Sequence, residues 1–246
     1  MNLIINLDNT VLNISEKYKE INDFVINQIL DILDKKKVNK NLILNQLNSY
    51  YKTYKEQFGV SINTYINSVL SVVSFHSGYC YSENPAYALG FLESFIDNVE
   101  QFKEFFKYDY SYCYGGFEFI KDIKNSFNKI IVYGESTDDL YEYKINQVID
   151  DLEELIFTNH YIVPEKDPIT MESIFLTEAI NPEETIVITS NVTEANIANT
   201  LGAKVIYIKN TPWYQKNNRT FINYDAIDFT VIDNLKEILL KEIEVS

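Results

Sequence analysis

The sequence predicts an α/β protein in which a Rossmann-like, three-layer parallel sheet core carries an inserted all-helical cap. Three observations lead to this prediction. A short apolar run of strand length opens the chain at 2–8, a block without strand alternation extends from about 15 to 106, and short β-branched runs then alternate with helical stretches. Because strand, helix and strand in repetition need crossover connections, we expect a parallel sheet covered on both faces.

The opening segment, NLIINLDNT, is interpreted as a strand that ends in polar residues. Its apolar run, Leu3-Ile4-Ile5, is too short for a helix. Asp8 stands at the end of the segment, with Asn6 two residues earlier on the same side. Because an acidic group at the end of a buried strand costs free energy unless it has a role, this end of the strand is a candidate site.

The middle of the chain is predicted to be helical. Ser15 is a plausible N-cap for SEKYKEINDFVINQILDILDKKK, whose apolar residues recur at helical spacing. Three further helical stretches follow, separated by GVS at 59–61 and HSGYCYSEN at 76–84. We expect the core to comprise 1–13 and 112–246, and the helical cap to comprise 14–111.

The second half of the chain supplies five further expected strands, at 129–133, 157–163, 185–190, 203–208 and 228–232. Each is a short run rich in β-branched or aromatic residues, and helical patterns such as YKINQVIDDLEEL lie between them. In a doubly wound sheet of this kind, ligands bind outside the carboxyl ends of the strands. The residues that follow each strand are therefore the candidate functional residues.

Composition narrows the classes of partner and compartment. The net charge of −15 argues against nucleic acid or an anionic membrane as a partner. Arg219 is the only arginine, so an anion site would have to use lysine or backbone N–H groups. Two cysteines, Cys80 and Cys113, and the lack of a signal-peptide pattern or an apolar run of membrane-spanning length favour a cytoplasmic protein.

Four segments, IINLDNTVL, IIVYGES, EKDPITMESIFLTEAINPEET and ITSNVTEANIANTLGA, carry a resemblance to a known family. In order and spacing they resemble the motifs of the haloacid dehalogenase (HAD)-like hydrolase superfamily, in the C1-type form with a helical cap inserted after the first motif. The resemblance covers essentially the whole chain outside the cap. It implies a Mg²⁺-dependent phosphatase or a related hydrolase.

The first two motifs depart from the family's pattern. Asn6 stands where the family has its nucleophilic Asp, and an amide oxygen is a much weaker nucleophile than a carboxylate. Asp8 retains the position of the acid and base that serves the leaving group and the water. Gly134 stands where the family has the Thr or Ser that binds the phosphoryl group, although Ser136 lies nearby.

The last motif departs as well. A gap-free register places Ser190 and Glu194 at the two acidic positions, whereas an alternative register with gaps places Asn191 and Asn196 there. Neither register supplies an Asp at the metal-binding position, and Mg²⁺ prefers hard anionic oxygen ligands. Lys166, in VPEKDP, matches the family's lysine and would still attract an anion.

These departures lead us to expect a degenerate active site, that is, a pseudoenzyme. The expected remnant catalytic positions are Asn6, Asp8 and Lys166; the expected ligand contacts are Asn6, Thr10, Gly134, Ser136 and Lys166; no metal is expected, with Asp8, Ser190 and Glu194 as weak candidates. The first hypothesis is a phosphatase-like protein without a cofactor that binds a small anionic ligand or a protein partner. The alternative is an active Mg²⁺-dependent phosphatase of a small phosphorylated metabolite with atypical motifs.

Each candidate residue also has a purely structural interpretation. An Asp after a strand often organises the following turn, and a Glu in the first turn of a helix is favoured by the helix dipole. Lys166 is equally compatible with a solvated or ion-paired loop lysine. His76 and His160 lie far apart in the sequence and show no partner there. Metal dependence is the property that separates the two functional hypotheses.

Overall fold

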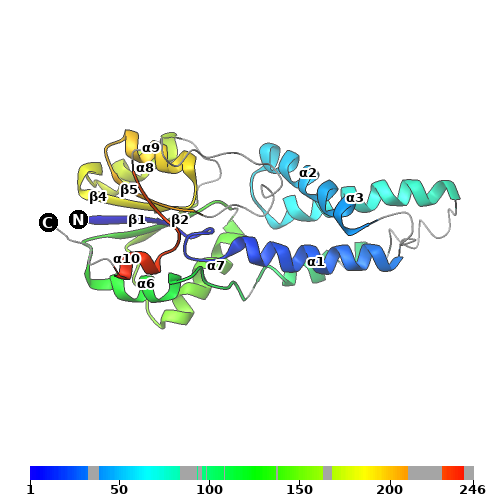
Figure 1. The fold of residues 1–246 in the computed structure, drawn as a ribbon, viewed down its shortest axis with the longest axis horizontal. Helices are drawn as coiled ribbons and strands as arrows, with labels where there is room; N and C mark the ends of the chain where they lie inside the picture. Colours follow the sequence, from blue (N-terminus) through cyan, green and yellow to red (C-terminus); the bar gives the residue numbers. More distant parts are fainter. Residues whose placement is uncertain are drawn as a thin grey trace. The chain divides into compact units, whose positions relative to one another are not determined.

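The chain divides into two compact units (Figure 1). Unit 1 consists of Met1–Ser15 and Asp109–Ser246, and unit 2 consists of Glu16–Tyr108. The sequence placed these boundaries after residues 13 and 111. The computed structural model describes residues 1–32, 39–83, 93, 96–97, 99–107, 109–136, 138–162, 168–209 and 229–240.

Unit 1 is built on a six-stranded sheet in which every pair of neighbouring strands is parallel. The strands are β1 (Asn2–Asn6), β2 (Ile130–Gly134), β3 (Asn159–Ile162), β4 (Thr185–Thr189), β5 (Lys204–Ile208) and β6 (Thr230–Ile232). They lie in the order β3-β2-β1-β4-β5-β6, so that β1 is central and the direction of winding reverses between β1 and β4. The predicted α/β class with a parallel sheet is confirmed.

Helices cover both faces of this sheet, as Figure 1 shows. One face carries α6 (Gly116–Asp122), α7 (Asp138–Leu152) and α10 (Lys236–Leu240), and the other carries α8 (Pro168–Glu178) and α9 (Val192–Thr200). Two 3₁₀ turns, Ile123–Asn125 and Pro182–Glu184, precede β2 and β4. The expected three layers are therefore present in unit 1.

The apolar strand residues explain why the sheet is buried on both sides. All five residues of β1, β2 and β4 are buried, as expected for parallel strands covered by helices. Ile4 and Val187 pack in one cluster with Ile174 and Phe175 of α8 and Ala195 of α9. Since side chains alternate along a strand, Asn6, two positions after Ile4, points toward this same α8–α9 face.

The first strand is shorter than predicted. It ends at Asn6 rather than at residue 8, because the backbone turns sharply after Leu7. The carbonyl of Leu7 accepts hydrogen bonds from the N–H groups of Val11 and Leu12, and Asn9 adopts a left-handed φ of 55°. Asp8 therefore lies in a turn just beyond the carboxyl end of β1.

The regular secondary structure in the described residues of unit 2 is all helical. Its main helices are α1 (Ile14–Ile32), which starts in unit 1, α2 (Lys40–Phe58) and α3 (Ile62–Glu83), followed by the short α5 (Val99–Glu104). Tyr18, Tyr51, Tyr65 and Phe106 form a buried aromatic core with ring centroids 5.3–6.3 Å apart. No helix in the described parts of either unit is long and apolar enough to cross a membrane.

Two local expectations about these helices are wrong. The predicted break at 76–84 does not occur, because α3 continues to Glu83 and contains Gly78; a single helical glycine costs only about 1 kcal/mol. Ser15 is not the N-cap of α1, which begins at Ile14. Instead, the side-chain oxygen of Asn9 accepts a hydrogen bond of 2.8 Å from the Ser15 N–H.

His76 makes the stability of the protein depend on pH. This residue is buried, and burial lowers its pKa from the usual 6.5. Its Nε2 lies 2.8 Å from Oε1 of Gln46. Below about pH 6.5 the unfolded chain binds a proton at this position more readily than the folded chain does, so folding stability falls as the pH falls.

We predict that His76→Gln reduces the loss of unfolding free energy between about pH 7 and about pH 5. His160→Gln is the matched control, because His160 is exposed. Urea denaturation at the two pH values measures the effect. A pH dependence that is unchanged by His76→Gln, or reduced equally by His160→Gln, would contradict this interpretation.

Candidate functional site

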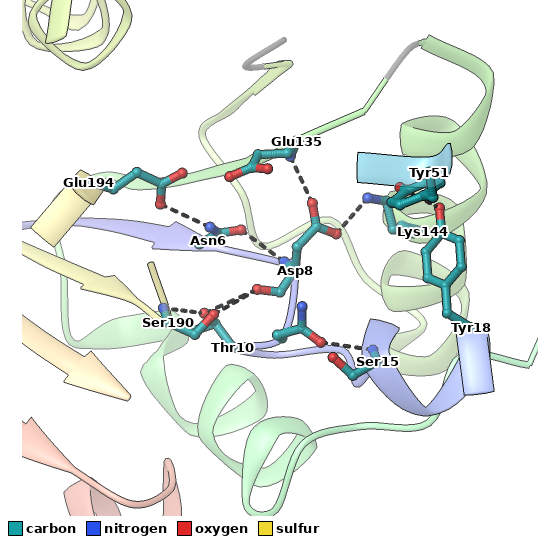
Figure 2. A network of polar contacts seen from close by, with 11 residues as sticks. Asn6, Asp8, Thr10, Ser15, Tyr18, Tyr51, Glu135, Lys144, Ser190 and Glu194 are labelled. Carbon is teal, nitrogen blue, oxygen red and sulfur yellow. Dashed lines mark hydrogen bonds and ion pairs between the residues drawn. The ribbon is translucent and has the colours of Figure 1, made fainter. Parts of the chain in front are cut away.

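The candidate site lies at the carboxyl ends of β1, β2 and β4, the three adjacent strands around the point where the winding reverses. Figure 2 shows polar side chains from the turns after all three strands converging there. They form two clusters. One surrounds the carboxylate of Glu194, and the other surrounds the carboxylate of Asp8.

Asn6, which the sequence resemblance assigns to the nucleophile position, is a hydrogen-bond donor to Glu194. Its side chain is buried on the α8–α9 face, and its Nδ2 lies 3.0 Å from Oε2 of Glu194 in the first turn of α9 (Figure 2). Its Oδ1 accepts a hydrogen bond of 2.8 Å from the N–H of Asp8. Both ends of the amide are therefore held by the protein itself.

Glu194 is only 3% exposed, and several donors stabilise its charge. Besides Asn6, its Oε2 accepts hydrogen bonds from the hydroxyls of Tyr133 at 2.6 Å and Thr189 at 2.7 Å. Burial raises the pKa of Tyr133 well above its ordinary value, and the negative charge of Glu194 raises it further. Tyr133 thus remains protonated and serves as a donor, as a buried carboxylate requires.

Asp8 forms an ion pair with a lysine from α7. Nζ of Lys144 lies 2.5 Å from its Oδ1, and the N–H of Glu135 donates to its Oδ2 at 2.7 Å. The side chain of Lys144 is only 2% exposed, and that of Asp8 13%. Both carboxylate oxygens of the expected general acid are thus engaged, and its charge is balanced by a buried ammonium group.

Gly134, at the end of β2, leaves room for an aromatic ring. A Cβ atom at this position would lie 3.0 Å from Cε2 of Tyr141 and 3.2 Å from Oδ2 of Asp8. Tyr141, from α7, is almost fully buried. The ring therefore packs where the side chain of a Ser or Thr at position 134 would begin.

The turns after the three strands are also bonded to one another. Oγ of Ser190 donates to the carbonyl of Asp8 at 3.1 Å, and the N–H of Ser190 donates to Oγ1 of Thr10 at 2.9 Å. The Asn191 side chain donates to Oε1 of Glu135 at 2.9 Å and caps α9 by accepting from the Thr193 N–H. These bonds link the turn after β4 to those after β1 and β2.

The structure brings together most of the sequence-predicted residues, with clear exceptions. Ser190 and Glu194 face β1, whereas Asn196 is exposed on α9. Ser136 is buried, and its Oγ has no hydrogen-bond partner among the described residues; the same is true of the Tyr141 hydroxyl. Lys166 lies outside the described residues.

The donor set does not fit Mg²⁺. Of the metal candidates, Glu194 accepts hydrogen bonds through Oε2, Ser190 donates to the Asp8 carbonyl, and the Asp8 carboxylate pairs with Lys144. Mg²⁺ needs several oxygen ligands in octahedral geometry, normally with carboxylates among them. No group of three or more His, Cys, Asp or Glu residues that could hold a metal occurs within the described part of the chain.

Two residues of the site, Lys144 and Tyr141, were not found by sequence reasoning. Both lie on α7, and motif matching with the family points to Lys166 instead. Their spacing of three residues was a usable signal, because residues at i and i+3 share a helix face. That face of the first helix after β2 lies beside the turn that contains Asp8.

Comparison with known proteins shows similarity in structure only. No family model matches the sequence, and no curated protein matches it. A HAD-like family hydrolase from Xanthomonas campestris superposes with a TM-score of 0.62 at 14% identity, covering 86% of this chain and 84% of that one. An L-2-haloacid dehalogenase from Xanthobacter autotrophicus with chloropropionic acid covalently bound gives 0.58 at 9% identity, covering 98% of both chains.

A predicted phosphoglycolate phosphatase from Haemophilus somnus 129pt gives a TM-score of 0.53 at 11% identity, covering 97% of this chain and 96% of that one. These neighbours include a dehalogenase and a predicted phosphatase, and at such low identity they establish the fold rather than an activity. The chain has the fold of the haloacid dehalogenase-like hydrolases.

Proposed function

We propose that this HAD-like protein does not transfer phosphoryl groups and acts in the cytoplasm as a binding or regulatory protein for a small anionic ligand or a protein partner. The observation that carries the proposal is the hydrogen bond from Asn6 to Glu194. At the nucleophile position the chain places a donor that stabilises a buried carboxylate. The family's chemistry needs a carboxylate at that position.

The amide of Asn6 is unsuited to nucleophilic attack for two reasons. It is uncharged, and the oxygen that would attack accepts a hydrogen bond from the Asp8 N–H. A carboxylate at position 6 would in turn face Oε2 of Glu194, since the present N···O separation is 3.0 Å. Like charges at such a distance strongly disfavour ionisation of both groups.

Asp8 is also poorly placed for acid–base work. A general acid must deliver a proton to the leaving group, whereas both oxygens of the Asp8 carboxylate already accept hydrogen bonds, one from Nζ of Lys144 at 2.5 Å and one from the N–H of Glu135 at 2.7 Å. An incoming phosphate would have to separate this ion pair or bind beside it without a balancing positive charge. Separating a buried pair leaves two desolvated charges and costs several kcal/mol, roughly 3–5.

Tyr141 and Gly134 support the same proposal. The hydroxyl that binds the transferred group in the family has no counterpart at position 134, and the ring of Tyr141 packs against the point where it would be attached. The features at positions 6, 8 and 134 favour a core whose polar residues stabilise its fold. They disfavour the alternative, an active Mg²⁺-dependent phosphatase.

Hydrolysis of a panel of phosphate esters, with and without Mg²⁺, tests the proposal. We expect no turnover by the unaltered protein. We also expect none from Asn6→Asp, because Gly134, Ser190 and the Asp8–Lys144 pair remain. Turnover by the unaltered protein that is abolished by a chelator and by Asp8→Asn would establish the alternative.

Asn6→Asp is predicted to destabilise the protein by about 3 kcal/mol at neutral pH, since it removes a donor and adds a second buried carboxylate beside Glu194. The deficit relative to the unaltered protein should shrink toward about pH 5, because two carboxylates in one site share a proton. Urea denaturation at both pH values measures it. Asn39→Asp is the matched control.

Asn39 caps α2 through its side-chain oxygen, a role that Asp fills equally well. The control should therefore change the unfolding free energy by less than about 0.5 kcal/mol. If Asn6→Asp were no more destabilising than Asn39→Asp, the claim that position 6 must carry a hydrogen-bond donor to Glu194 would be wrong.

Gly134→Ala is predicted to cost about 1–3 kcal/mol, because the added methyl group would meet the Tyr141 ring at 3.0 Å. In a Tyr141→Leu background the cost should fall below about 1 kcal/mol, since the smaller side chain leaves room. Thermal or urea denaturation of the four proteins gives the interaction energy. Strictly additive effects would show that Tyr141 does not fill this position.

A further inference from the structure

Four polar side chains of α7 form one stripe that contacts two different parts of unit 1. Tyr141, Lys144, Gln147 and Asp151 are spaced by three, three and four residues, which places them on one face of the helix. The first two contact the turn around Asp8 and Gly134. The other two contact the return segment, defined here as residues 109–113, where the chain comes back into unit 1.

Gln147 holds the return segment by two hydrogen bonds to one residue. Its Oε1 accepts from the N–H of Tyr110 at 2.8 Å, and its Nε2 donates to the carbonyl of Tyr110 at 2.7 Å. Asp151 accepts a hydrogen bond of 2.8 Å from the hydroxyl of Tyr112. The Gln147 side chain thus satisfies the backbone N–H and C=O groups of Tyr110, as a neighbouring β-strand would otherwise do.

The return segment is also paired with the turn that follows Asp8. The N–H of Asn13 donates to the carbonyl of Ser111 at 2.7 Å, and the N–H of Cys113 donates to the carbonyl of Val11 at 2.8 Å. Together these contacts form a continuous series. The ion pair joins Asp8 to Lys144, α7 joins Lys144 to Gln147, and Gln147 bonds to the return segment. The return segment in turn bonds to Asn13, in the turn that follows Asp8.

This series of contacts involves both chain segments that connect the two units. The chain leaves unit 1 after Ser15, two residues beyond Asn13, and returns at Asp109, immediately before Tyr110. Asp109 adopts a left-handed φ of 65°, a conformation that is uncommon for non-glycine residues but that Asp tolerates better than most. The position of both connections therefore depends on contacts made by α7 and by the turn after β1.

We propose that α7 is a mechanical link that couples the Asp8–Lys144 ion pair to the return segment, so that a change at Asp8 alters how firmly the connection to unit 2 is held. The link does not require catalysis, so it would operate whether the protein is an inactive binding protein or an active phosphatase. Occupation of Asp8 by a ligand, or loss of its partner, would loosen the return segment through Lys144 and Gln147.

Amide hydrogen exchange tests the link, with the β4 amides of the same protein as the internal reference for global stability. We expect Lys144→Met to accelerate exchange of the return segment about tenfold relative to β4, the effect of losing about one hydrogen bond's stabilisation. The matched control is Lys121→Met, which removes an exposed lysine of α6 and should leave the ratio unchanged.

Two further variants keep the test decisive. Asp8→Asn combined with Lys144→Met removes both charges, so it leaves no unpaired buried carboxylate, and it should give the same acceleration if Lys144→Met alone does not fold. Gln147→Ala should accelerate exchange by itself and abolish any additional effect of Lys144→Met. An unchanged ratio in the folded variants, or an undiminished effect of Lys144→Met in the Gln147→Ala background, would overturn the proposal.

Discussion

The hydrogen bond between Asn6 and Glu194 is the constraint on which the candidate site depends. A carboxylate that is 3% exposed must be satisfied by donors, and the strand ends supply them from Asn6 of β1, Tyr133 of β2 and Thr189 of β4. This cluster joins three adjacent strands to α9. A carboxylate at position 6 would place like-charge repulsion at its centre.

The second cluster follows the same principle with different chemistry. Asp8 is neutralised by the ammonium of Lys144, which is itself buried, so the pair adds no net charge to the site. Such a pair contributes little to stability compared with apolar side chains, but removing one partner is costly. Its importance here is positional, because Lys144 ties the turn after β1 to α7 and thereby to the return segment.

Regular elements were predictable from local pattern, whereas contacts between distant segments were not. Short runs rich in β-branched or aromatic residues predicted the six strands of the described sheet, and periodicity indicated a helical block between the first and second. The break expected at 76–84 does not occur within α3, because one helical glycine costs only about 1 kcal/mol. Motif matching pointed to Asn6, Asp8 and Gly134, which lie close together, and to Lys166, which lies outside the described residues and stays a prediction. The lysine that pairs with Asp8 is Lys144, 136 positions away in the sequence.

The exchange of the Asn6 side-chain amide protons tests the central claim most directly. The signal of this NH₂ group in ¹⁵N-labelled protein is identified by its absence in Asn6→Asp. Its protons should exchange slowly with water because the group donates to a buried carboxylate. Its chemical shifts should not move when millimolar Mg²⁺ is added. Fast exchange would show that Glu194 does not hold the amide, and a saturable shift on adding Mg²⁺ would show that position 6 faces a metal site; either result would contradict the proposal.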